Sequence, residues 1–279
     1  MNSRAAKMLS RCNKGGRGLE IGPSFNPIAP KREGYNIRIM DHLDKRGLVE
    51  KYRNHPNVPK GYENIIEDVD YVWDGRPYPE LVDGTFDYIV SAHLIEHVPD
   101  LIGHINDCCE ILNPDGVYSL AVPDKRFSFD YYRPLTTAED AVRRKGLTGY
   151  EDSLIVEYYE KVIYNGNDPS WDKLDRRKDF RNVYPPEEVK KVKANPQAYA
   201  ADLHVSVFTP RSFFDLMNSL YDSGEIRMSL VCVDEDTVSG EFFAVFRKGE
   251  AGERTFVPMK PWRIPVYRVR RLAGKLLKR

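Results

Sequence analysis

Short apolar segments of strand length alternate with polar and glycine-rich turns through the first half of the chain. Residues 100–112 also carry apolar side chains at helical spacing. Strands that alternate with helices predict an open, mostly parallel α/β sheet, in which ligands bind at the carboxyl ends of the strands. The strands expected from this pattern cover residues 19–21, 36–40, 86–90 and 117–122, and residues 64–73 should contain a further strand and its exit.

Two further apolar segments, residues 226–233 and 241–247, follow each other across a short link. Consecutive strands joined in this way must pair antiparallel. A helix is expected before them over residues 211–220, because Thr209 and Pro210 form a strong helix start signal. The end of the sheet should therefore contain a strand that runs against the others.

Residues 125–203 interrupt the alternation of strands and helices. They are rich in aromatic and charged residues, and their prolines preclude one long helix, although residues 151–163 have a helical pattern. An excursion whose aromatic rings form a small separate core is the ordinary explanation. A segment that contacts a ligand is the alternative.

Polar residues stand where the expected strands end. Glu20 ends the first strand, and Gly22 allows the backbone to turn where a side chain would collide with a ligand. Asp41 ends the second strand about twenty residues later, where a carboxylate can accept hydrogen bonds from ribose hydroxyls. Ser91 and His93 follow the fourth strand. A dinucleotide site is not indicated, because the Gly-x-Gly-x-x-Gly motif is absent.

Taken together, these motifs resemble those of class I S-adenosylmethionine (SAM)-dependent methyltransferases. Residues 86–100 are similar to the fourth-strand motif of the family, in the Glu-His-Val-Pro form common in enzymes for small molecules, and residues 101–124 resemble its next helix and fifth strand. The resemblance covers residues 15–124 and 204–248. It implies a doubly wound, mostly parallel sheet of seven strands, with the last strand reversed and an insertion after the fifth.

The resemblance also implies SAM as cofactor. An acidic residue after the third strand would meet the adenine amino group, and Asp70 is an alternative to Asp68 in this role. Ser24 stands where the family usually has a small residue, which leaves a non-catalytic SAM-binding fold as an alternative to an enzyme. The cofactor residues expected on this basis are Glu20, Gly22, Ser24, Asp41, Asp68, Val69, Ser91 and His93.

Methyl transfer to an alcohol benefits from a general base, and histidine can take a proton near neutral pH. The candidates are His93, His97, Asp124 and His204. His93 is the first of them because it lies at the end of the fourth strand. A structural role is the competing interpretation for His97 and His204.

The loop Leu-Glu-Ile-Gly-Pro-Ser-x-Asn-Pro is also similar to bacterial methyltransferase-domain proteins associated with glycan biosynthesis. This likeness implies O-methylation of a sugar or glycan precursor. The alternatives are methylation of another small metabolite and a non-catalytic module that binds a glycosyltransferase. We expect a core at residues 1–124 and 204–248, a lid that shapes the acceptor region at 125–203, and a basic tail at 249–279.

Composition narrows the partners of the 279-residue chain. Lys and Arg number 42, as do Asp and Glu, so the formal net charge of +0 gives no support for a nucleic-acid partner. Residues 258–279 are basic and interleaved with apolar residues, a pattern that fits contact with a membrane surface or a glycosyltransferase and, equally, a flexible solvated terminus. The four cysteines lack metal-ligand spacing, so no metal site is expected. Neither a signal peptide nor a long apolar run is apparent, which indicates a cytoplasmic protein.

Overall fold

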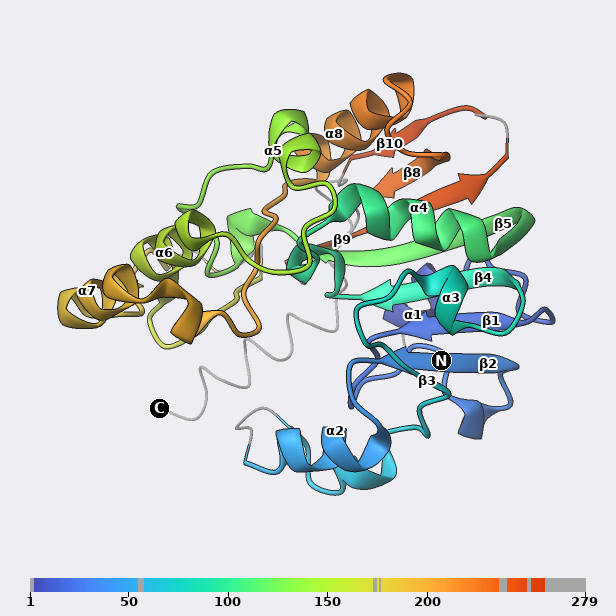
Figure 1. The fold of residues 1–279 in the computed structure, drawn as a ribbon, viewed down its shortest axis with the longest axis horizontal. Coiled ribbons are helices and arrows are strands. Elements are labelled where there is room, and N and C mark those ends of the chain that lie inside the picture. Colours follow the sequence, from blue (N-terminus) through green and yellow to red (C-terminus); the bar gives the residue numbers. More distant parts are fainter. Residues whose placement is uncertain are drawn as a thin grey trace, which may run out of the picture.

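The structure is a computed structural model that describes residues 3–54, 58–172, 175, 177–235, 240–249 and 252–258. An eight-stranded sheet forms its centre, in the order β10-β8-β9-β5-β4-β1-β2-β3 (Figure 1). The strands are β1 (Gly18–Ile21), β2 (Ile37–Asp41), β3 (Tyr71–Val72), β4 (Phe86–Ala92), β5 (Leu112–Pro123), β8 (Met228–Asp234), β9 (Glu241–Lys248) and β10 (Thr255–Val257).

The expected doubly wound α/β fold is confirmed. Strands β1 to β5 pair in parallel, whereas β9 runs antiparallel to both β5 and β8. The main helices are α1 (Ser3–Met8), α2 (Lys45–Tyr52), α3 (Tyr78–Leu81), α4 (Leu101–Ile111), α5 (Ala138–Arg143), α6 (Asp152–Lys161), α7 (Pro186–Ala194) and α8 (Pro210–Asp222). No helix among the described residues is long and apolar enough to span a membrane.

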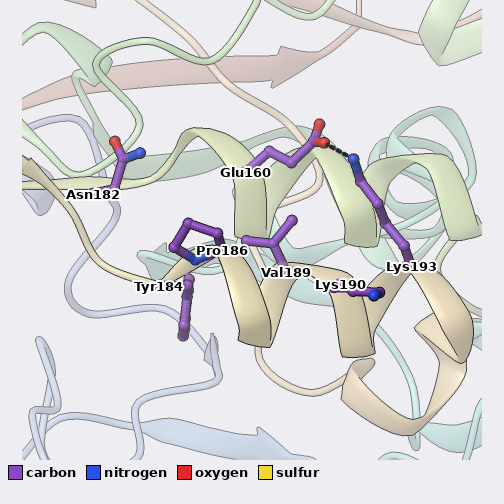
Figure 2. Close-up of a pocket in the computed structure, with 7 residues that line it drawn as sticks. All are labelled: Glu160, Asn182, Tyr184, Pro186, Val189, Lys190 and Lys193. Carbon is purple, nitrogen blue, oxygen red and sulfur yellow. Dashed lines mark ion pairs between the residues drawn. The ribbon is translucent and has the colours of Figure 1, made fainter.

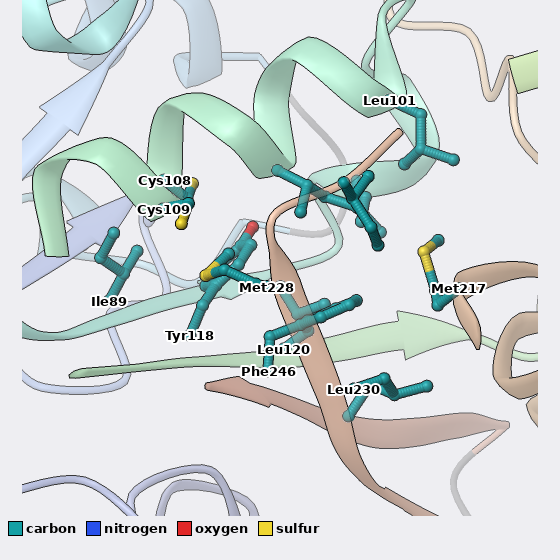
Figure 3. Packing of buried hydrophobic residues seen from close by; sticks show 14 of the residues in the cluster. Ile89, Leu101, Cys108, Cys109, Tyr118, Leu120, Met217, Met228, Leu230 and Phe246 are labelled. Atoms are coloured by element: carbon teal, nitrogen blue, oxygen red, sulfur yellow. The ribbon is translucent and has the colours of Figure 1, made fainter. Parts of the chain in front are cut away.

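Two apolar cores cover the faces of the sheet. The larger one includes buried residues of α4 and α8 together with side chains of β5, β8 and β9 (Figure 3). Cys108 and Cys109 belong to it and are 0% and 5% exposed, so both serve as buried packing residues. The smaller core lies on the other face, where Met8 and Leu9 at the end of α1 pack with residues of β2 and β4.

The expected number of seven strands is wrong, because residues 255–257 add β10 beside β8. This strand falls within the segment expected to be a tail. Phe256 anchors it, with its ring centroid 5.6 Å from that of Phe214 on α8. Most of the expected basic tail, residues 259–279, lies outside the described residues, and so does the contact proposed for it.

The third strand is much shorter than the expected segment 64–73. Only Tyr71 and Val72 pair with β2, and residues 62–64 form a short 3₁₀ helix. The reason lies at Asp70, whose carboxylate accepts the backbone N–H of Ile39 at 2.8 Å and so replaces a ladder hydrogen bond. Residues 113–116, which fall between the helical segment 100–112 and the expected strand 117–122, lie within β5, at a register shift where Phe86 pairs with Leu112 but Tyr88 with Val117.

Residues 125–203 form a group of helices at one end of the sheet (Figure 1). They contain α5, α6, α7 and a separate two-stranded sheet of β6 (Ile163–Asn165) and β7 (Phe180–Asn182). Many of their aromatic rings pack on one another, such as Tyr131 with Phe180 at 4.8 Å and Tyr159 with Tyr184 at 4.2 Å. Since the segment leaves the sheet at the end of β5, it begins at the carboxyl edge of the parallel strands.

Candidate active site

Glu20 organises the loop that follows β1. The residue is 1% exposed, and its two carboxylate oxygens accept the backbone N–H groups of Ile28 at 2.6 Å and Ala29 at 3.1 Å. Burial raises the pKa of Glu20 to about 7, although the two amide donors act in the opposite direction. The carboxylate therefore fixes the course of the loop and does not face solvent.

Gly22 joins this loop to the segment after β4. Its φ of 68° lies in the left-handed region, where a side chain is strained. A Cβ atom at this position would stand 3.2 Å from Cδ1 of Leu94. The first loop and the residues after β4 are thus in close contact at the carboxyl edge of the sheet.

Asp41 ends β2 and holds the same loop from a second side. Oδ2 of Asp41 accepts the backbone N–H of Ser24 at 3.1 Å, and Oδ1 accepts both the backbone N–H and Nδ1–H of His42, at 2.8 and 2.6 Å. Ser24 has a φ of 48°, and its hydroxyl accepts a hydrogen bond from Tyr52 at 3.0 Å. Because the Asp41 side chain is 1% exposed, a ribose hydroxyl reaches it only if Ser24 or His42 moves.

The expected third strand would place Asp68 and Val69 after it. In the structure both residues precede β3. The exposed carboxylate of Asp68 forms an ion pair with Lys45 at the start of α2, at 3.3 Å. The residue that follows β3 is Trp73, which is 40% exposed and donates its backbone N–H to the carbonyl of Asp41 at 2.8 Å. Trp73 is therefore a candidate to stack on the adenine ring, and sequence reasoning missed it because it placed the end of the strand before Asp68.

Ser91 does not point towards the expected cofactor site. Its buried hydroxyl lies 2.8 Å from the hydroxyl of Tyr118, which lies 2.8 Å from Nε2 of His104. Nδ1 of His104 is 2.9 Å from the hydroxyl of Tyr78. Desolvation lowers the pKa of His104 to about 4, so this chain of polar groups is neutral at pH 7. It crosses the core beneath α4.

His93 is the most accessible histidine at the end of the parallel strands. Its φ of 53° turns the chain sharply after β4, and its side chain is 44% exposed. Nε2 of His93 donates to Oε2 of Glu241 at 2.9 Å, and Nδ1 lies 3.6 Å from Oε1 of Glu96. Although burial opposes it, hydrogen bonds from His93 and Arg4 lower the pKa of Glu241 to about 2.

The other two candidate histidines meet at Glu96, in the 3₁₀ helix η3 (Ile95–His97). Oε1 of Glu96 lies 3.8 Å from Nε2 of His204, and the rings of His97 and His204 have centroids 4.7 Å apart. Nδ1 of His204 donates to Asp130 at 2.6 Å. Burial lowers the pKa of His97, whereas Asp130 outweighs burial and raises the pKa of His204.

Asp124 is fully occupied within the fold. The residue is 0% exposed and begins the 3₁₀ helix η4 (Lys125–Phe127). Both of its oxygens accept hydrogen bonds from the guanidinium of Arg126, at distances of 2.6 to 3.1 Å. This carboxylate positions the start of the insertion and is not available to take a proton from an acceptor.

The structure therefore brings His93, His97 and His204 together around Glu96, whereas the carboxylate of Asp124 is held by Arg126. Sequence reasoning missed Glu241 and the role of Glu96 as their neighbour. Glu241 could have been found, because the first residue of an antiparallel strand lies at the same edge as the last residues of the parallel strands. Its partner in the sheet is Pro123, at the end of β5.

The pocket shown in Figure 2 is separate from this edge. It has a volume of about 360 Å³ and lies between α6 and α7 in the insertion, where Glu160 and Lys193 form an ion pair at 2.5 Å. None of its lining residues belongs to the predicted cofactor or catalytic set.

The carboxyl edge suits SAM in the kind and position of its groups. Glu20 and Asp41 place carboxylates at the ends of the neighbouring strands β1 and β2, and Gly22 leaves the backbone between them without a side chain. Asp41 accepts three hydrogen bonds, and a carboxylate has room for about four.

Comparison with known proteins gives one match to a family model. Residues 2–219 match the model of a methyltransferase domain. No curated protein matches the sequence.

Solved structures resemble the chain at low identity. The N-methyltransferase NodS from Bradyrhizobium japonicum WM9 is 12% identical over 88% of this chain and 95% of its own, with a TM-score of 0.38. The methyltransferase CcbJ from Streptomyces caelestis is 14% identical over 88% of this chain and 94% of its own, with a TM-score of 0.43. The 1,6-didemethyltoxoflavin-N1-methyltransferase from Burkholderia thailandensis, solved with S-adenosylhomocysteine, is 12% identical over 88% of this chain and 76% of its own, with a TM-score of 0.40. Since these TM-scores lie below 0.5, only the family model bears on the assignment.

Proposed function

The chain belongs to the methyltransferase-domain family and is a SAM-dependent methyltransferase, and from this premise we propose that it methylates a hydroxyl group of a sugar or glycan precursor. The observation that carries the proposal is the hydrogen bond between His93 and Glu241. It gives an exposed imidazole at the carboxyl edge a fixed orientation and a fixed tautomer.

The tautomer follows from the state of Glu241. A carboxylate with a pKa of about 2 is ionised at neutral pH and can only accept, so Nε2 of His93 carries the hydrogen. Nδ1 of a neutral His93 then holds the lone pair. A base whose orientation is set by a third group is the recurring arrangement for activating a hydroxyl.

SAM, when bound, supplies a methyl group that a sulfonium has already activated. The protein then has to orient the acceptor, exclude water and receive one proton. SAM would give its methyl group to the acceptor oxygen as its carbon–sulfur bond breaks, and it would leave as S-adenosylhomocysteine. Nδ1 of His93 would take the proton of the acceptor hydroxyl. An acid–base contribution of this kind is worth about 10²- to 10⁴-fold in rate.

The groups around His93 favour a polyhydroxylated acceptor over an apolar one. Glu96, His97 and His204 gather beside it, and each offers a polar atom within 4.8 Å of the other two. An apolar metabolite would leave Nδ1 of the exposed His93 without a hydrogen-bond partner, which is costly in a desolvated site. The likeness of the first loop to proteins of glycan biosynthesis supports the same acceptor class. Contact of residues 258–279 with a glycosyltransferase or a membrane stays a prediction.

Calorimetry with S-adenosylhomocysteine and an acceptor screen test the proposal. We expect binding by the full chain and at least tenfold weaker binding by Asp41→Ala, since Asp41 lies where the ribose is expected. A panel of sugar nucleotides, free sugars, aromatic metabolites and lipids is then incubated with methyl-labelled SAM. Transfer to sugars that is lost in His93→Gln supports the proposal. Transfer to aromatic or lipid acceptors alone would contradict the proposed sugar acceptor and identify one of these classes in its place.

A further inference from the structure

Glu96 is a buried carboxylate to which the described part of the chain supplies no hydrogen bond. The residue is 0% exposed, and among the described residues neither of its carboxylate oxygens has a hydrogen-bond partner. An isolated buried carboxylate is costly unless a cation or a proton compensates for its charge. The atoms that approach it are nitrogens of histidine, His93 Nδ1 at 3.6 Å and His204 Nε2 at 3.8 Å.

The ring nitrogens of His97 and His204 are oriented by acceptors on their far sides. Nδ1 of His97 donates to the carbonyl of Leu203 at 3.1 Å, and Nδ1 of His204 donates to Asp130 at 2.6 Å. In the neutral form of each ring, Nε2 therefore carries the lone pair. Metal-binding histidines show this pattern, in which the second ring nitrogen donates to a carbonyl or a carboxylate.

The acceptor for His204 is itself held in place. Nη1 of Arg133 donates to Asp130 at 2.9 Å and to the carbonyl of His204 at 2.7 Å. The backbone carbonyl of Glu96 accepts the N–H groups of Val205 at 2.7 Å and Ser206 at 3.0 Å. The return of the chain from the insertion is thereby fixed against η3, and the three side chains are kept together.

We propose that Glu96, His97 and His204 bind a divalent cation of the first transition row, such as Zn²⁺. One donor atom of each residue lies within 4.8 Å of the other two. Zinc binds such atoms at about 2.0–2.2 Å, so the donors have to approach to about 3–3.5 Å by small side-chain rotations. Two imidazoles and one carboxylate are a donor set that these metals accept, and three protein ligands leave a position open.

Metal binding by these three residues does not depend on the proposed O-methylation, but the role of the metal in catalysis rests on that proposed function. A hydroxyl bound at the open position would become more acidic, because a bound divalent cation lowers the pKa of its oxygen ligand. His93 borders the cluster on the side of Glu96 and would receive the proton. The absence of metal-ligand spacing in the sequence is explained by the insertion, which separates His97 from His204 in the chain.

The competing explanation is a metal-free ion cluster, in which a protonated His204 lies between Asp130 and Glu96. Equilibrium dialysis of the full chain against Zn²⁺, with metal measured by atomic emission, separates the two. We expect one tightly bound Zn²⁺ per chain and a loss of at least tenfold in affinity for Glu96→Gln and for His204→Gln. His42→Gln removes an exposed imidazole outside the cluster and should bind Zn²⁺ as the unmodified chain does. Circular dichroism establishes that each variant is folded.

A second readout uses Co²⁺, whose visible absorption reports nitrogen and oxygen ligands. Bands that appear with one equivalent of Co²⁺ and are absent in Glu96→Gln support the site. No Zn²⁺ bound to the unmodified chain, or equal binding by all variants, would overturn it. The same samples are titrated with S-adenosylhomocysteine, so that a chain which binds this ligand but no metal refutes the metal site without touching the methyltransferase assignment.

Discussion

Nε2 of His93 and Oε2 of Glu241 are 2.9 Å apart, although the two residues are 148 positions apart in the chain. Arg4 of α1 donates to the same carboxylate, with Nε and Nη2 each 2.9 Å from an oxygen. The side chain at the end of β4 is thus oriented by the first residue of β9, which is fixed in turn by the first helix.

Replacement of the orienting carboxylate should slow the reaction without weakening cofactor binding. In Glu241→Gln the charge is lost and the amide can rotate to donate, so the tautomer of His93 is no longer fixed. We expect kcat to fall by about 10²-fold, the lower end of what acid–base catalysis contributes, with an unchanged KM for SAM. Steady-state kinetics with the acceptor found in the screen measure both. Glu110→Gln, which changes an exposed carboxylate of α4 that pairs with Arg227, is the control; an equal loss in that variant would contradict the role of Glu241.

The first loop allows a matched comparison of two glycines. Gly22 and Gly34 both have positive φ, 68° and 86°, but a Cβ atom at Gly22 would meet Leu94 at 3.2 Å, whereas one at Gly34 would meet nothing within 4 Å. Each Gly→Ala change should cost about 1–2 kcal/mol of unfolding free energy from backbone strain. Urea unfolding measures this cost.

Only Gly22→Ala should also weaken the binding of S-adenosylhomocysteine, because only this residue lies at the carboxyl edge of β1. Calorimetry on the two variants decides the question. Equal affinities in both would mean that the turn at Gly22 shapes the loop without approaching the cofactor.

Glu20 should make the protein less stable as the pH rises. Burial raises its pKa to about 7 in the folded state, against the ordinary value of 4.5. Ionisation between these two values therefore favours the unfolded chain, and the stability that Glu20 provides at low pH is lost as pH rises from 4.5 through 7. The loss is at most about 3 kcal/mol, from a shift of about 2.5 pH units. Unfolding free energies from pH 5 to 8 should fall less steeply in Glu20→Gln than in the unmodified chain.

His104 should make the protein less stable as the pH falls. Burial lowers its pKa from 6.5 to about 4, so protonation favours the unfolded chain. The stability is present above pH 6.5 and is lost as pH falls towards 4, again by at most about 3 kcal/mol. In His104→Gln, the unfolding free energy measured from pH 7 to 4 should fall less steeply than in the unmodified chain. A slope that persists in the variant would assign the acid sensitivity to other groups.

Sequence reasoning located the residues that end regular strands. Glu20, Gly22 and Asp41 lie at the carboxyl edge because each follows an apolar run that is unambiguous. It failed at Ser91, since β4 is buried on both faces and its pattern does not reveal which face a residue occupies. It also failed at β3 and β10, which have only two and three residues and depend on side-chain contacts such as those of Asp70 and Phe256.

The meeting of Glu96, His97 and His204 was beyond the reach of sequence patterns. All six histidines can be read from the sequence, but the path of residues 125–203 decides which of them meet. That path depends on long-range hydrogen bonds, such as those from Arg133 and from the backbone of Val205, which leave no periodic signal.

The position of β9 also sets the order in which the working protein can appear during synthesis. This strand lies between β5 and β8, yet the ribosome makes it after both. Until residue 248 has left the ribosome, β5 and β8 each present an unpaired edge, which is a hazard for aggregation. The residue that orients His93 arrives with the same strand. A chain that stops before β9 therefore lacks both the strand that joins β5 to β8 and the oriented imidazole, so the two arrive in the same late step.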